Sequence, residues 1–146
     1  MEQFSGKNQF PRINCDTLRF GVTLNTAANA QKEGAPIRLT GDEAAELISS
    51  ANTYPSGFIL QAAKNINDNT RCTAIPYEGG HEILGVADDA VTAGTLVSVI
   101  GWDATEGKGI YAAAQNGNWV CGIVERGGGA GEVITIITKS PTQYAD

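Results

Sequence analysis

Residues 109–125, GIYAAAQNGNWVCGIVE, decide the fold class that the sequence predicts. Two β-prone runs, 109–115 and 119–125, flank Asn116-Gly117, a dipeptide typical of the two-residue turn of a β-hairpin. The second run alternates between two faces, one of which is formed by Trp119, Cys121 and Ile123. The stretch therefore predicts two antiparallel strands joined by a tight turn.

Similar strand signals occur on both sides of this hairpin. Residues 17–24 alternate apolar and polar side chains, as a half-buried strand does. Together with the hairpin, the second half of the chain carries five short β-prone segments, which are 70–77, 95–100, 109–115, 119–125 and 132–138. Turn residues separate these segments, and no internal repeat is recognisable in the sequence. The fold class is therefore mainly β, a small β-barrel or β-sandwich.

One short α-helix is expected within this β fold. The stretch 40–43, TGDE, matches a capping box, in which Thr40 is the N-cap and Glu43 the N3 residue. The apolar residues that follow have helical spacing: Ala44, Leu47, Ile48 and Ala51. The pattern predicts a helix over 40–51. Residues 25–35 are expected to form a loop, and 58–66 fit either a strand or a helix.

The pattern divides the chain into three parts. Residues 1–16 are expected to form an extended N-terminal arm, 17–139 a single mainly-β domain and 140–146 a polar C-terminal tail. The arm contains Phe4 and Phe10, aromatic side chains that favour docking on a partner. Ordinary terminal disorder explains the arm equally well.

The charge balance argues against nucleic-acid binding. The 146 residues include 10 Lys and Arg against 16 Asp and Glu, a formal net charge of −6 that nucleic-acid phosphates repel. No apolar run is long enough for a transmembrane helix, and no secretory signal is expected at the N-terminus. Cys15, Cys72 and Cys121 are far apart in the sequence, so we expect buried thiols rather than disulfides.

Candidate catalytic and metal-ligating residues are few. His81 is the only histidine, and a small hydrolase or lyase would need it beside a carboxylate or a nucleophile. Four residues close in sequence match no known spacing of metal ligands: His81, Glu82, Asp88 and Asp89. The glycine-rich run 127–131 leads into a strand and matches no phosphate-binding loop. We therefore expect no enzymatic activity, no cofactor and no metal.

Trp102 stands at the end of a β-prone segment and is the candidate for an exposed binding residue. Together with Asp103 and Tyr111 it would supply the aromatic and acidic groups of a carbohydrate site. A carbohydrate- or receptor-binding β domain is therefore one function that the sequence allows.

The segment 83–139 carries three short motifs in a fixed order. They are an acidic turn with a strand entry, ADDAVTAGTLVSV over 87–99, a second strand, VCGIV over 120–124, and a last strand, EVITI over 132–136. In this order the motifs resemble the small decoration, or cement, proteins of tailed-bacteriophage capsids. The helix expected over 40–51 and the long N-terminal region have no counterpart in that family.

The resemblance implies a compact β-tulip-like fold without catalysis, in a protein made in the host bacterial cytoplasm and bound to the outer surface of the capsid in the virion. Its partners would be the major capsid protein and copies of itself in a homotrimer, with neither nucleic acid nor membrane bound. Such a protein cements neighbouring capsomers and stabilises the mature head. The residues that we expect at capsid or subunit contacts are Phe4, Phe10, Arg12 and Trp102. A carbohydrate- or receptor-binding domain displayed on the virion is the alternative.

Overall fold

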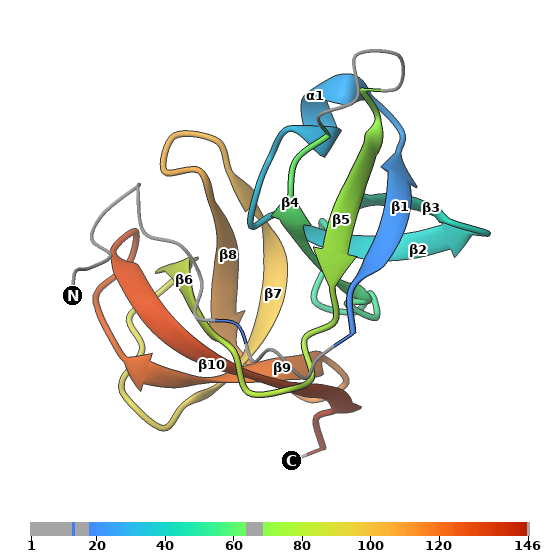
Figure 1. Ribbon diagram of the computed structural model, residues 1–146. Coiled ribbons are helices and arrows are strands. Elements are labelled where there is room, and N and C mark those ends of the chain that lie inside the picture. The colour runs from blue at the N-terminus through green and yellow to red at the C-terminus, as the bar shows by residue number, and fades with distance from the viewer. Residues whose placement is uncertain (1–12, 14–17, 64–68, 146) are drawn as a thin grey trace.

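The computed structural model of the chain describes residue 13, residues 18–63 and residues 69–145 (Figure 1). Within these residues the chain forms ten strands and one helix of four residues. In chain order the elements are β1 (Phe20–Leu24), α1 (Ala27–Ala30), β2 (Pro36–Gly41), β3 (Ala44–Leu47), β4 (Gly57–Gln61), β5 (Arg71–Ile75), β6 (Glu82–Ala87), β7 (Leu96–Asp103), β8 (Lys108–Ala113), β9 (Trp119–Arg126) and β10 (Val133–Gln143). The mainly β fold class with one short helix is confirmed.

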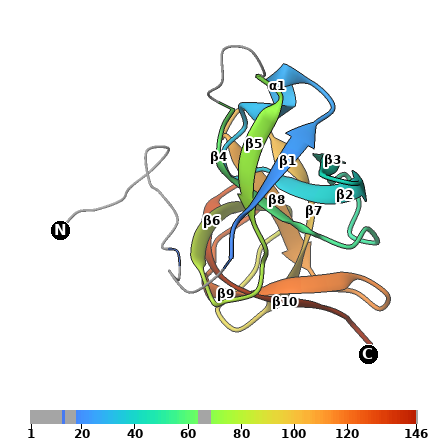
Figure 2. The same ribbon diagram turned by 45° about the vertical axis from the view of Figure 1, so that its right-hand side comes forward.

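The strands close into two five-stranded barrels, which lie one above the other in Figures 1 and 2. Barrel 1 consists of β1 to β5 in the order β1-β3-β2-β4-β5, and barrel 2 of β6 to β10 in the order β10-β6-β8-β7-β9. The sequence predicted a small barrel or sandwich in a single unit over 17–139. The described part of that range holds two small barrels, joined by the connection 76–81.

The two barrels repeat the same strand connectivity. In each barrel the first strand lies beside the third and the fifth, and the second lies between the third and the fourth. The first and third strands are parallel in both barrels, and every other neighbouring pair is antiparallel. Strands β1 to β5 are therefore equivalent, in chain order, to strands β6 to β10.

Two irregularities in the strand pairing fall at the same places in the two barrels. The second strand shifts register against the third within 39–41 of β2 and within 99–101 of β7. The fourth strand shifts against the fifth within 59–61 of β4 and within 124–126 of β9. A bulge adds a residue and bends its strand, so matching bulges mean matching curvature. The barrels are thus two copies of one structural unit, which the sequence did not reveal as a repeat.

A glycine turn precedes the second strand of each barrel. Gly34 and Gly94 have φ angles of +90° and +92°, a left-handed conformation that glycine adopts without steric cost. The N–H of Gly34 donates to the carbonyl of Ile59, and the N–H of Gly94 donates to the carbonyl of Val124, at 2.7 and 2.8 Å. In each barrel the turn therefore ties the start of the second strand to the fourth strand.

The two cores differ in side-chain size. Five of the ten buried residues in the core of barrel 1 are alanines, and Trp102 of β7 packs against this core from barrel 2. The core of barrel 2 is built from Val, Ile and aromatic side chains, and it extends into barrel 1 to Ile48, Phe58 and Ile75. Each core therefore includes a contribution from the other barrel, and the two barrels pack as one unit.

A buried hydrogen bond anchors the connection between the barrels. The hydroxyls of Tyr77, in the connection, and Tyr111, on β8, lie 2.8 Å apart and share a hydrogen bond. The ring of Phe58 packs edge-on against Tyr77, with 5.3 Å between the ring centroids. Burial raises the pKa of both tyrosines well above the usual 10, so both hydroxyls stay protonated. We call this contact of Phe58, Tyr77 and Tyr111 the seam.

The helix predicted over 40–51 is wrong. Glu43 has a φ of +56° in the tight turn between β2 and β3, which no helix tolerates in its first turn. The residues after it form β3, which pairs with β2 through Leu39 and Ala45 and with β1 through Leu24 and Ala45. Pairing on both sides closes barrel 1 and overrides the helical propensity of Ala, Glu and Leu. The short helix lies instead at Ala27–Ala30, where a loop was expected.

The hairpin predicted around Asn116-Gly117 is also wrong, although its turn forms. Gly117 has a φ of +90°, as a tight turn requires. The flanking strands do not pair with each other, because β8 pairs with β6 and β7 whereas β9 pairs with β7 and β10. The turn is held from elsewhere, since the N–H of Gly117 donates to the carbonyl of Tyr144 at 2.9 Å.

Three further differences concern the extent of strands. Residues 58–61 of the segment left open at 58–66 belong to strand β4, residues 64–66 lie outside the described residues, and strands β2 and β6 were not predicted. Strand β10 continues to Gln143, so residues 140–143 of the expected tail belong to barrel 2. There Thr142 and Gln143 pair with Val120 and Trp119 of β9.

Candidate functional site

His81, the candidate acid–base residue, lies just before β6 and is fully buried. Its backbone N–H donates to the Thr138 hydroxyl, and its backbone carbonyl accepts the backbone N–H of Thr138, both at 2.8 Å. The ring meets Phe58 edge-on, with centroids 6.1 Å apart. Burial lowers the pKa of His81 below the usual 6.5, the charge of Arg19 lowers it further, and a hydrogen bond with the backbone of Glu78 opposes both. This position beside the seam gives the His81-with-carboxylate enzyme no geometric support.

Two of the carboxylates near His81 in the sequence lie in a solvated turn. Asp88 and Asp89 are exposed in the turn after β6, where Asp89 Oδ1 accepts the N–H of Ala90 at 2.8 Å. Across the described residues, no group of three or more His, Cys, Asp or Glu side chains is placed to hold a metal ion. In the same part of the chain, no helix is long and apolar enough to cross a membrane.

The glycine-rich run 127–131 is a close-packed connection between β9 and β10. A Cβ on Gly127 would lie against the carbonyl oxygen of Val91, so only glycine fits there. Gly128 and Val91 exchange both backbone hydrogen bonds at 3.0 Å. The N–H of Gly129 donates to the carboxylate of Glu132 at 2.6 Å, so this backbone donor faces an anion of its own chain.

The residues of the carbohydrate alternative do not meet on the surface. Trp102 is half-buried and packs against the core of barrel 1, and Tyr111 is fully buried at the seam. Asp103 caps its own turn, because Oδ1 accepts the N–H groups of Thr105 and Glu106 at 2.9 Å each. The geometry therefore gives this set no shared binding face, and Trp102 is a contact between the two barrels.

The candidate arm residues Phe4, Phe10 and Arg12 lie outside the described residues, as does Cys15. Ile13 is described, and it packs half-buried against the core of barrel 2. Cys72 and Cys121 are buried, as expected. Burial raises the pKa of their thiols to about 11 and about 12, so neither is a thiolate at neutral pH.

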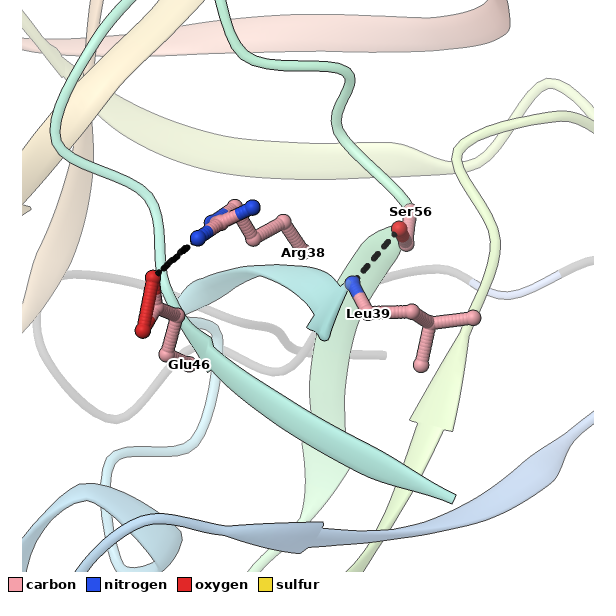
Figure 3. A network of polar contacts seen from close by, with 4 residues as sticks. All are labelled: Arg38, Leu39, Glu46 and Ser56. Atoms are coloured by element: carbon pink, nitrogen blue, oxygen red, sulfur yellow. Dashed lines mark hydrogen bonds and ion pairs between the residues drawn. The ribbon is translucent and has the colours of Figure 1, made fainter. Parts of the chain in front are cut away.

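Polar contacts on the outside of barrel 1 are shown in Figure 3. The guanidinium of Arg38 on β2 donates to the carboxylate of Glu46 on β3 through Nε at 2.9 Å and through Nη2 at 2.6 Å. The Ser56 hydroxyl accepts the N–H of Leu39 at 2.9 Å. Both side chains of the ion pair are about 40% exposed, at 44% and 39%. These contacts fasten β2 to its neighbours on a solvated face.

An exposed apolar row crosses three neighbouring strands of barrel 2. Leu96 of β7 lies directly opposite Ile123 of β9, and Ile123 lies opposite Ile137 of β10. Opposed residues share one face of a sheet, so the three side chains form a continuous row. Leu96 is 36% exposed, Ile123 is 38% exposed and Ile137 is half-buried. We call Leu96, Ile123 and Ile137 the outer row.

The sequence contains a signal for the outer row that the search for apolar–polar alternation did not detect. Strands β7 and β10 have apolar residues on both faces, for example Leu96 beside Val97 and Ile136 beside Ile137. A strand that is apolar on both faces needs cover on both sides or else exposes one apolar face. The outer row is the uncovered face.

No protein-family model matches this sequence, and no curated protein matches it. Among solved structures, the crystal structure of the N base of head fiber gp8.5 of bacteriophage phi29 is similar to this chain. The two are 14% identical, the similarity covers 88% of this chain and 99% of that chain, and the TM-score is 0.49. These values assign the chain to no family.

Proposed function

We propose that this chain is a structural protein of a bacteriophage virion that binds the outer surface of the capsid as a homo-oligomer, with a trimer expected, and has no enzymatic activity. In this role it holds neighbouring capsomers of the major capsid protein together and stabilises the mature head. The observation that carries the proposal is the ordered set of motifs over 83–139, which resembles capsid decoration proteins. The phi29 protein is described as the base of a head fiber, and the proposal does not rest on it.

The three motifs lie side by side in barrel 2, which supports treating them as one unit. The N–H of Gly94 in the first motif donates to the carbonyl of Val124 in the second at 2.8 Å. The N–H of Val124 donates back to the carbonyl of Thr95 at 2.8 Å. Ile136 of the third motif pairs with Val124 from the other side. Motifs that are far apart in the sequence therefore build one three-stranded face.

Stabilisation of a shell by such a protein follows from linkage. A ligand that binds the mature shell and not its precursor or its separated subunits shifts the equilibrium toward the mature shell. Binding at many symmetry-related positions adds these contributions over the whole lattice. For this chain we expect the arm residues Phe4, Phe10 and Arg12 to make capsid contacts.

Co-sedimentation with capsids tests the proposal directly. The purified chain is mixed with expanded, undecorated capsids of its own phage, and with unexpanded procapsids as the control. We expect saturable binding to expanded capsids alone, at a fixed ratio to the major capsid protein. Binding to neither particle would overturn the proposal.

A matched pair of variants then tests the arm. Phe4→Ala/Phe10→Ala is expected to weaken co-sedimentation, because large apolar anchors dominate binding energy at contacts of this kind. Leu18→Ala is the control, because Leu18 is 84% exposed and follows the arm in the sequence without belonging to the candidate set. Equal binding by both variants would show that Phe4 and Phe10 do not contribute to capsid binding, which would then depend on the barrels.

A further inference from the structure

The structural repeat gives the outer row a counterpart in barrel 1. In barrel 1 the same register runs from Pro36 of β2 to Phe58 of β4 and on to Ile75 of β5. The strand equivalence and the matching bulges place these three residues at the positions of Leu96, Ile123 and Ile137. Both rows are fully apolar, so the unit repeats a surface as well as a strand order.

The two rows differ in what covers them. In barrel 1 all three residues are buried, and the cover is the other copy of the unit. Phe58 packs against Tyr77 and His81, which lead into barrel 2. The ring of Pro36 approaches Gly109 of β8. A Cβ built on Gly109 would lie 3.6 Å from Cδ of Pro36. In barrel 2 no third barrel covers the equivalent row among the described residues, and Leu96 and Ile123 are exposed.

We propose that the outer row, Leu96 with Ile123 and Ile137, is the surface through which one copy of this chain binds a second copy. Within the chain, this row of the unit buries itself against another unit, and a second copy brings further units of the same kind. The outer row would thus make, between two chains, the kind of contact that the equivalent row of barrel 1 makes with barrel 2 inside one chain. A contiguous exposed apolar row on adjacent strands is a feature of association surfaces.

The charge distribution favours a second copy as the occupant. Copies with a net charge of −6 repel one another, so they must meet through a surface that carries no net negative charge. The outer row is uncharged, and charged residues of both signs lie beside it. Glu82 of β6 lies directly opposite Ile137, and Lys139 lies two residues beyond Ile137 on β10.

The charges beside the row are complementary between copies. Lys139 Nζ is held at the surface by the Thr142 hydroxyl at 3.0 Å and the Ser140 carbonyl at 3.2 Å. When two outer rows meet about a symmetry axis, opposite charges such as Glu82 of one copy and Lys139 of the next can pair beside the apolar contact. The arrangement serves a trimer as well as a dimer, because rows can converge on an axis of either order.

The test is the oligomeric state of the full chain in solution, measured by light scattering after size-exclusion chromatography and by sedimentation equilibrium. The wild type is expected at a mass that is a multiple of 15.3 kDa. Leu96→Lys/Ile123→Lys is expected to weaken association by about 100-fold or more, because it buries unpaired charges in an apolar contact. Leu39→Lys is the matched control and is expected to associate like the wild type, because Leu39 is an exposed strand leucine, 47% accessible, on barrel 1.

A second pair of substitutions keeps the test decisive if the lysine variant fails to fold. Leu96→Thr/Ile123→Thr shortens the apolar row while placing a β-branched polar residue at each strand position. Association weakened in this variant and retained in Leu39→Lys would support the proposal. A wild type that stays monomeric at every concentration reached would overturn it. Association that survives in both row variants, or that is lost equally in Leu39→Lys, would also overturn it.

This inference deepens the self-association part of the proposed function, and the two fail separately. Solution mass reports the outer row without any capsid present. A folded, monomeric row variant that still co-sediments with expanded capsids would keep the capsid proposal and limit the outer row to contacts between copies. If the wild type associates through the outer row but does not co-sediment with capsids, the outer-row proposal stands and the capsid proposal is overturned.

Discussion

Barrel 1 and barrel 2 share a strand order, a parallel pair and two bulges, yet they treat the same three positions in opposite ways. Phe58 of barrel 1 is 1% exposed, whereas the equivalent Ile123 of barrel 2 is 38% exposed. The cores differ too, with alanines in barrel 1 and larger side chains in barrel 2. The pairing pattern therefore defines the unit, while the burial of a given position depends on which neighbour covers it.

The largest expected effect comes from truncating the two equivalent residues. Phe58→Ala should lower the free energy of unfolding by about 3–5 kcal/mol, because it opens a cavity at the seam. Ile123→Ala should change it by about 0.5 kcal/mol or less, because the side chain is exposed in a single copy. Urea denaturation at a protein concentration where the chain is monomeric measures both. Similar losses for both variants would contradict the covered-versus-uncovered contrast between the rows.

Equivalent glycines give the next effect. The register places Gly57 opposite Ile37 in barrel 1 and Gly122 opposite Val97 in barrel 2. A Cβ on Gly57 would press on the carbonyl oxygen of Ile75, which is backbone, whereas a Cβ on Gly122 would press first on a methyl group of Ile136.

A methyl group gives way more easily than backbone that is held by strand pairing. Gly57→Ala should therefore destabilise by about 3 kcal/mol and Gly122→Ala by about 1 kcal/mol, as overpacking typically does. The difference in urea midpoint between the two variants measures this ranking. A larger loss for Gly122→Ala would mean that β9, and not β4, is the more rigid fourth strand.

The strands of barrel 2 were the more predictable half of the fold. Runs such as 95–100 and 132–138 are rich in β-branched residues, and they became β7 and β10. Barrel 1 was harder, because its small core accepts alanine, a residue with high helix propensity. Residues 44–47 therefore predicted a helix, although Ala45 fits the narrow interior of barrel 1 and β3 is needed to close it.

Long-range pairing accounts for the rest of what the sequence did not predict. The Asn116-Gly117 turn forms as expected, but which strands pair depends on the barrel order and not on the turn. The repeat could not be recognised in the sequence, because the two barrels share strand register and bulge positions but not the residues that form them. The burial of His81, in the connection before β6, also depends on a distant residue, since Thr138 satisfies its backbone.

The two barrels also differ in a titratable residue, which makes stability depend on pH. His81, the chain's only histidine, stands at the start of barrel 2, two residues before Ile83. The register makes Ile83 equivalent to Phe20, so the counterpart of His81 in barrel 1 is Leu18. The lowered pKa of folded His81 means that the unfolded chain takes up a proton first as the pH falls below 6.5.

Stability contributed by neutral His81 is therefore present above pH 6.5 and is lost below it. The free energy of unfolding should fall by up to about 1.4 kcal/mol per pH unit between 6.5 and the lowered pKa. His81→Leu should remove this component and leave the slope that is due to carboxylates. Denaturation of both proteins at pH 7.5 and 5.5 measures it, and equal pH slopes would show that His81 titrates normally.

The smallest expected effects have opposite signs at equivalent positions on the second strands. Arg38 of β2 forms an exposed ion pair with Glu46, and the corresponding residue of β7 is Ser98. Ser98 is fully buried, and its hydroxyl has no hydrogen-bond partner among the described residues. A buried hydroxyl without a partner costs stability, whereas an exposed ion pair contributes little.

Ser98→Ala should therefore raise the free energy of unfolding by about 1 kcal/mol, because it removes a buried polar group without opening a large cavity. Arg38→Ala should lower it by about 0.5 kcal/mol or less, and added salt should shrink that loss because the pair is exposed to solvent. Thermal denaturation of both variants at low and high salt measures the contrast. A destabilised Ser98→Ala would place a bound water or another hydrogen-bond partner on the hydroxyl.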